Sequence, residues 1–197
     1  MSKLLFLDIE TTGTDPKKHQ ILQIAAKELD SEEIFNKYVG SGGDGVVDLG
    51  ALKYNKINII SSGGVMDDNE YNVLTDFCDY LLKLKPKKPM IICGQNVHFD
   101  FYFIKERLSK YEIEGLEDLI SYKMIDLNTL STVLVNLGTI ETKNNSTCMA
   151  QVAKTLGIRV HDEKLHAANY DVKLSEKLYK KLLILLGDNN VDKNSER

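Results

Sequence analysis

Residues 4–15 read LLFLDIETTGTD, an apolar run that is interrupted by two acids, Asp8 and Glu10. Side chains alternate between the two faces of a β-strand, so Phe6, Asp8 and Glu10 share one face of the strand predicted over residues 4–9. Carboxylates at the end of a buried strand cost free energy unless positive charge meets them. With α-carbons about 6.5–7 Å apart, the two acids can hold divalent cations. The alternative is a strand end whose acids simply meet water.

The composition is that of one globular domain. Of 197 residues, 43% are hydrophobic and 27% are charged, and no apolar run reaches the roughly 18 residues of a membrane span. The first apolar stretch meets acid at Asp8, so we expect no signal peptide. Three cysteines without a CxxC pair argue against a disulfide framework and favour the cytoplasm. The net charge of −4 argues against a wide basic surface for duplex nucleic acid, but it allows a few nucleotides to be held with help from metal ions.

The pattern of apolar residues beyond the first strand predicts a mixed α/β fold. Two further strands are predicted over residues 20–29 and 33–39, and their short connection favours an antiparallel meander. Helical periodicity and short apolar runs predict the remaining elements, which are helices over 68–85, 97–111, 127–136, 146–156 and 168–186, and strands over 89–93 and 122–125. The sequence therefore predicts one sheet flanked by helices in a domain over residues 1–186, followed by a polar, disordered tail over residues 187–197.

A second acidic stretch, IICGQNVHFDFYFIKERL over residues 91–108, places Asp100 near the start of a helix that follows a buried strand. Strand ends are where α/β folds build their sites, which favours a functional role for Asp100 and for Asn96. The alternatives are structural, because an acid in the first turn compensates the helix dipole and an asparagine can cap a helix.

The third stretch is HAANYDVKLSEKLY, residues 166–179. If the helix begins near Ala168, His166 lies on the preceding loop and Asp171 faces inward beside Leu174 and Leu178. Both side chains can then reach one site. The alternative is a capped amphipathic helix that is preceded by a surface histidine.

Taken together and in this order, D-x-E, N-x-x-F-D and H-x-A-x-x-D resemble the motifs of the DEDDh branch of the DnaQ-like exonucleases. DIETTG is close to the first motif and GQNVHFD matches the second, and the resemblance covers residues 4 to about 180. It implies a ribonuclease H-like fold with a five-stranded mixed sheet, in which antiparallel and parallel strands are flanked by helices. Some relatives carry tyrosine four residues before the last aspartate, where this chain has Ala167, so His166 indicates the histidine branch.

The resemblance also implies a chemistry, hydrolysis of the 3′-terminal phosphodiester with release of a nucleoside 5′-monophosphate. Asp8, Glu10 and Asp171 would bind metal directly, and Asp100 would help to bind a second metal, directly or through water. His166 would be the general base, since the pKa of histidine suits proton removal near neutral pH. Two Mg²⁺ ions per site are expected, with Mn²⁺ able to substitute, because the ligands are all oxygens.

Substrate contacts follow from the same resemblance. Backbone around Thr11 and Thr12 would meet the terminal 3′-hydroxyl, and Asn96 and Phe99 would lie near the last nucleotide. Tyr54 is a candidate for stacking on the terminal base, with core packing as its alternative.

The expected substrate is a single-stranded or frayed 3′ end of DNA, as in proofreading or repair. A 3′–5′ exoribonuclease that degrades RNA or short oligoribonucleotides is the nearest alternative. A non-catalytic nucleic-acid-binding domain on the same fold is an alternative of another class. A DNA polymerase or another replication protein is an expected partner, and no membrane is expected.

Overall fold

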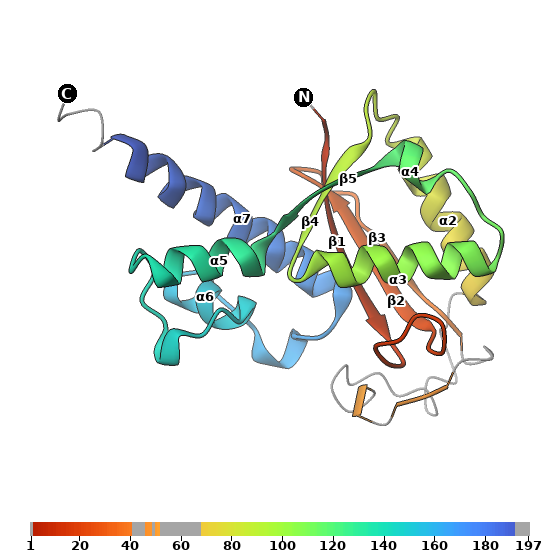
Figure 1. Ribbon diagram of the computed structural model, residues 1–197, viewed down its shortest axis with the longest axis horizontal. Helices are drawn as coiled ribbons and strands as arrows, with labels where there is room; N and C mark the ends of the chain where they lie inside the picture. Colours follow the sequence, from red (N-terminus) through yellow and green to blue (C-terminus); the bar gives the residue numbers. More distant parts are fainter. Residues whose placement is uncertain (1, 41–45, 49, 52–67, 192–197) are drawn as a thin grey trace.

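The computed structural model describes residues 2–40, 46–48, 50–51 and 68–191, and the side chains of 188–191 are not described. Its centre is a sheet of five strands in the order β3-β2-β1-β4-β5 (Figure 1). The strands are β1 (Leu4–Thr11), β2 (Ile21–Glu28), β3 (Phe35–Tyr38), β4 (Met90–Gly94) and β5 (Ile120–Asp126). The first three pair antiparallel, whereas β4 runs parallel to both β1 and β5. The predicted mixed sheet is confirmed.

Helices cover both faces of this sheet (Figure 1). One face carries α2 (Glu70–Lys83), α3 (Val97–Lys110) and the short α4 (Leu116–Leu119). The other carries α5 (Leu127–Asn136), α6 (Met149–Thr155) and α7 (Ala168–Val191). Two 3₁₀ turns, Lys143–Asn145 and Asp162–Lys164, lie before α6 and α7.

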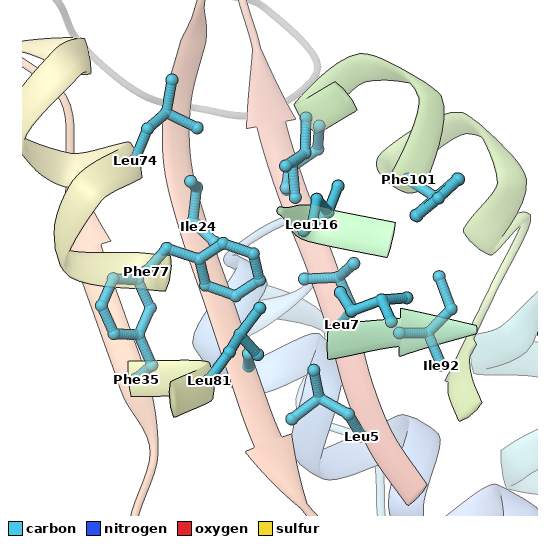
Figure 2. Close-up of a cluster of buried hydrophobic side chains, with 14 of the residues drawn as sticks. Leu5, Leu7, Ile24, Phe35, Leu74, Phe77, Leu81, Ile92, Phe101 and Leu116 are labelled. Atoms are coloured by element: carbon cyan, nitrogen blue, oxygen red, sulfur yellow. The ribbon is translucent and has the colours of Figure 1, made fainter. Parts of the chain in front are cut away.

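The alternation of β1 divides the core into two clusters. Leu5 and Leu7 lie beside Ile92 of β4 and in the same cluster as Phe77 of α2 (Figure 2). On the opposite face, the ring of Phe6 meets that of Tyr179 of α7 edge-on, with centroids 5.8 Å apart. Because Asp8 and Glu10 follow Phe6 on this face, the packing directs the two acids toward the side of the sheet that α7 covers.

Several boundaries differ from the predicted ones. β1 continues to Thr11, and β5 begins at Ile120. The four-residue α4 was not predicted, because one helical turn is too short to show a period. α7 runs five residues beyond the predicted end, to Val191, so the first residues of the predicted tail are helical. Gly157 follows α6 with φ +74°, a left-handed conformation that favours glycine directly after a helix.

Within the described residues, no helix has both the length and the apolar character that crossing a membrane requires.

Candidate active site

A cleft of about 1030 Å³ opens where β1, β4 and β5 end, on the side of α6 and α7. It brings together side chains from all three acidic stretches of the sequence. Its lining includes Asp8, Glu10, Thr11, Asn96, Phe99, Asp100, His166 and Asp171. The predicted catalytic residues therefore share one site, at the carboxyl ends of the parallel strands where α/β folds commonly bind ligands.

Three carboxylates form the centre of the cleft. One ligand oxygen each from Asp8, Glu10 and Asp171 lies within 4.8 Å of the others. Glu10 and Asp171 are buried, with 9% and 6% of their surface exposed. Three carboxylate oxygens this close form a donor set for a hard divalent cation, which removes the cost of burying like charges together. The residues present therefore fit the metal that the sequence predicts.

The start of α7 is fixed by β2. Gln23, which pairs with Glu10 across the β1–β2 ladder, accepts a hydrogen bond from the backbone N–H of Ala168 at 3.1 Å. The backbone N–H of His166 donates to Oδ2 of Asp171 at 3.0 Å, and His166 has φ +67°. This left-handed turn keeps the histidine on the loop before α7, beside the carboxylates.

Asp100 joins the site from the first turn of α3. Its Oδ1 accepts a hydrogen bond of 2.8 Å from the backbone N–H of Ile9, so α3 is attached directly to the strand that carries the two first acids. The close approach of β4 to β1 requires Gly94, because a Cβ there would lie 2.6 Å from the carbonyl oxygen of Leu7. Asp100 lies outside the group of three mutually close carboxylates, which fits the predicted binding of a second metal.

Burial and mutual repulsion dominate the electrostatics of the site. Burial raises the pKa of Asp8 well above its usual range, and the charges of Asp100, Asp171 and Glu10 raise it further. Burial also raises the pKa of Asp100 to about 7, against the hydrogen bond from Ile9, and the charge of Asp126 adds to the rise. Among the described residues that line the cleft, none is a lysine or an arginine. The described lining therefore offers no lysine or arginine to balance the negative charges of these carboxylates.

The predicted substrate residues divide into three groups. Thr11, Asn96 and Phe99 line the cleft. Thr12 does not; it is fully buried, and its hydroxyl donates to the Val46 carbonyl and accepts from the Gln20 N–H, which makes it a support for the loop. Tyr54 lies outside the described residues.

Several lining residues were not predicted. They are Gln95, His98, Asp126, Asn128, Thr147 and Cys148. Asp126 had a detectable signal, because it stands between a predicted strand and a predicted helix, as Asp100 does near the end of β4. Thr147 and Cys148 come from the segment before α6 and had no such signal.

Comparison with known proteins shows which family the chain belongs to. The model of the exonuclease family matches residues 5–179. The chain belongs to the exonuclease family. Ribonuclease T of Buchnera aphidicola (subsp. Schizaphis graminum) is 22% identical to this exonuclease over 187 residues, which cover 90% of this chain and 81% of the relative. The oligoribonuclease of Vibrio campbellii is 27% identical over 138 residues, covering 64% and 72% of the two chains.

Among solved structures, E. coli exonuclease I in complex with a dT13 oligonucleotide superimposes with a TM-score of 0.72 at 21% identity. The match covers 98% of this exonuclease and 43% of exonuclease I, so this chain spans less than half of that protein. The likeness shows the ribonuclease H-like fold. Family and fold predicted from the three motifs are confirmed, and with them the assignment of the chain to the 3′–5′ exonucleases.

Proposed function

We propose that this chain hydrolyses the 3′-terminal phosphodiester of single-stranded nucleic acid with two Mg²⁺ ions and releases nucleoside 5′-monophosphates. One observation carries the proposal. Three mutually close carboxylates, Asp8, Glu10 and Asp171, share a cleft with Asp100 and His166, and the lining described for this cleft contains no lysine or arginine. An anionic substrate can enter such a site only when cations are bound there.

The carboxylates have the role of holding these cations. Asp8, Glu10 and Asp171 would hold one Mg²⁺, and Asp100 would help to hold the second through the oxygen that Ile9 does not engage. When bound, the two ions neutralise the phosphodiester and stabilise the attacking and departing oxygens. An all-oxygen set of ligands favours Mg²⁺ or Mn²⁺ over zinc.

His166 has the role of general base. It stands on the loop before α7, next to Asp171 in the cleft, where it can take a proton from the water that attacks phosphorus. The backbone at Thr11 would meet the terminal 3′-hydroxyl, and Asn96 and Phe99 would contact the last nucleotide. Phe99 is 38% exposed at the cleft, as a base-stacking ring must be.

Single-stranded DNA is the first candidate substrate, and the exonuclease I complex with dT13 supports it as a structural precedent. RNA is the second candidate, favoured by the names of the curated relatives, ribonuclease T and oligoribonuclease. A replication partner such as a DNA polymerase and a cytoplasmic location remain part of the proposal.

One assay tests the proposal. DNA and RNA strands of matched sequence, labelled at either end, are incubated with the chain in Mg²⁺, Mn²⁺ or EDTA. We expect 5′-labelled strands to shorten in single steps, 3′-labelled strands to release labelled mononucleotide first, and EDTA to stop both reactions. The faster of the two sugars identifies the substrate.

Two variants on the same helix test whether cleavage depends on the residues of the cleft. Asp100→Asn should abolish shortening, whereas Glu106→Gln, an exposed acid on the same helix, should leave the rate unchanged. Binding of both strands without any metal-dependent shortening would overturn the proposal in favour of a non-catalytic binding domain. Full activity of Asp100→Asn would overturn the role given to that residue.

A further inference from the structure

A polar network joins the ends of β4 and β5 at one side of the cleft. Oδ1 of Asp126 accepts hydrogen bonds from the backbone N–H groups of Asn96, at 2.8 Å, and Asn128, at 3.1 Å. Its Oδ2 accepts from the hydroxyl of Thr129 at 2.7 Å. Asp126 therefore holds together two turns that lie about thirty residues apart in the sequence.

The same network joins two amide side chains in the cleft. Nδ2 of Asn128 donates to Oδ1 of Asn96 at 3.0 Å, and both residues line the cleft. Asn96 occupies the N-cap position of α3 with φ +54°, but its side chain makes no capping hydrogen bond. Its Nδ2 makes no hydrogen bond to any residue that the structure describes. The Asn96 side chain therefore does not cap the helix, and its Nδ2 is available to donate to a ligand.

The amide pair lies to one side of the carboxylates. β5 is two strands along the sheet from β1, which is a displacement of about 10 Å at the spacing of paired strands. Thr11, whose backbone is proposed to meet the terminal 3′-hydroxyl, ends β1 and lines the same cleft. A strand whose 3′ end lies at β1 and which continues along the cleft toward β5 would reach Asn96 and then Asn128.

The chemistry of this wall suits a sugar–phosphate backbone. No lysine or arginine belongs to the described lining, whereas the amides of Asn96 and Asn128 lie in it as uncharged donors. Amide N–H groups donate to the oxygens of sugar and phosphate, and they do so without the salt dependence of a basic contact.

We propose that Asn128, held beside Asn96 at the last nucleotide, forms a subsite for the nucleotide on the 5′ side of the scissile phosphodiester, where its amide hydrogen-bonds sugar and phosphate oxygens. Asp126 is the positioning residue of this subsite, since it orients both asparagines and lies outside the group of three close carboxylates. The inference rests on the proposed exonuclease function and extends it from the last nucleotide to the last two.

Two substrates distinguish a variant that impairs the subsite from one that impairs the catalytic centre. The p-nitrophenyl ester of thymidine 5′-monophosphate has a terminal nucleotide and a scissile phosphodiester but no second nucleotide, whereas a thymidine trinucleotide has all three. For Asn128→Ala we expect kcat/KM on the trinucleotide to fall about 3- to 10-fold, the equivalent of one hydrogen bond, with the ester unaffected. Asn136→Ala, an exposed asparagine at the other end of α5, is the control and should change neither rate.

The role of Asp126 is tested by combining variants. If Asp126 acts through Asn128, the double variant Asp126→Ala/Asn128→Ala should be no slower on the trinucleotide than Asp126→Ala alone. Thermal unfolding shows which variants are folded, and Asn128→Ala decides the proposal even if Asp126→Ala does not fold. An unchanged trinucleotide rate, an equal loss on both substrates, or a similar loss in Asn136→Ala would overturn the subsite. A wild-type chain that cleaves neither substrate in Mg²⁺ would instead overturn the proposed function.

Discussion

Two of the buried acidic centres in the described part of the chain differ in how their charge is balanced. On the face of the sheet that α2 and α3 cover, Glu70 is 3% exposed and pairs with Arg107, which is 2% exposed. Glu70 also accepts hydrogen bonds from the N–H of Ile21 at 2.8 Å and from the hydroxyl of Tyr111 at 3.0 Å. At the carboxyl ends of the strands, the acids of the proposed active site have no lysine or arginine within the described lining of their cleft.

The difference separates a structural carboxylate from a functional one. Glu70 receives its counter-charge from Arg107 and its hydrogen-bond donors from the fold, so it needs no external ion. Burial and the charges of Asp100, Asp171 and Glu10 instead raise the pKa of Asp8, and the described lining of the cleft holds no lysine or arginine to oppose them. We therefore expect the second centre to weaken the metal-free protein and divalent cations to stabilise it, as where a site is built for function rather than stability.

The largest expected effect lies at the functional centre, on a residue that binds no metal. His166→Ala should lower kcat by about 10²- to 10⁴-fold, because it removes the general base. The increase in melting temperature produced by Mg²⁺ should persist, since the carboxylates are intact. Single-turnover assays and thermal unfolding measure the two quantities.

His161→Ala is the matched control for this variant. His161 lies five residues earlier, pairs with Glu163 and does not line the cleft, so its loss should leave the rate unchanged. An active His166→Ala chain would remove the general base from the proposed mechanism.

The structural centre should respond in the opposite way. Arg107→Leu leaves Glu70 buried without its cation and should reduce the free energy of unfolding by about 3–5 kcal/mol, as measured by urea denaturation. The fraction that stays folded should cleave at nearly the wild-type rate per molecule, because Arg107 does not line the cleft.

A double variant distinguishes a lost ion pair from a lost contact. Glu70→Leu/Arg107→Leu removes both charges and should be more stable than Arg107→Leu alone. If the double variant were the less stable of the two, packing rather than an unpaired charge would explain the loss.

The two centres also differ in how far the sequence predicts them. Asp8, Glu10, Asp100, His166 and Asp171 were identified from strand alternation, helix starts and the resemblance of three motifs, and all five line the cleft. Local patterns of this kind are visible in sequence because they depend on neighbours one helical turn or one strand pair away.

The Glu70–Arg107 pair has no such signal. Arg107 stands among charged residues in a helix and resembles a solvated one, and its partner lies 37 residues away on another helix. Asn128 had no local signal either. Asp126 stands between a predicted strand and a predicted helix, but the hydrogen bonds of both residues to the turn after β4 are not visible in any local pattern. Long-range pairing depends on the tertiary arrangement, which the periodicity of single elements does not determine.

A smaller effect should appear in the dependence of stability on pH. The pKa of Asp100 rises to about 7 in the folded chain, while an unfolded aspartate titrates near 3.9. The folded state therefore keeps a proton that the unfolded chain releases, so stability falls as pH rises between about 4 and 7. In EDTA the chain should melt at a lower temperature at pH 8 than at pH 5.5. Mg²⁺ takes the place of the proton and should raise the melting temperature more at pH 8.

Asp100→Asn tests this assignment. The variant cannot titrate at position 100, so the difference between the two pH values in EDTA should shrink. Asp8, whose pKa is also raised, contributes in the same direction and accounts for the part of the difference that remains. Acids with ordinary pKa values are largely ionised at both pH values and add little. A wild-type chain that becomes more stable in EDTA as pH rises would contradict the raised pKa.

The smallest effect is expected from an ion pair that neither centre uses. Lys83 and Glu33 lie 2.9 Å apart, but their side chains are 70% and 54% exposed. Water screens this pair, so Lys83→Ala should change the free energy of unfolding by about 0–1 kcal/mol, against several for Arg107→Leu. Urea denaturation of the two variants at low and high salt makes the comparison direct. A loss at Lys83 as large as that at Arg107 would mean that distance alone, and not burial, determines what an ion pair contributes to this fold.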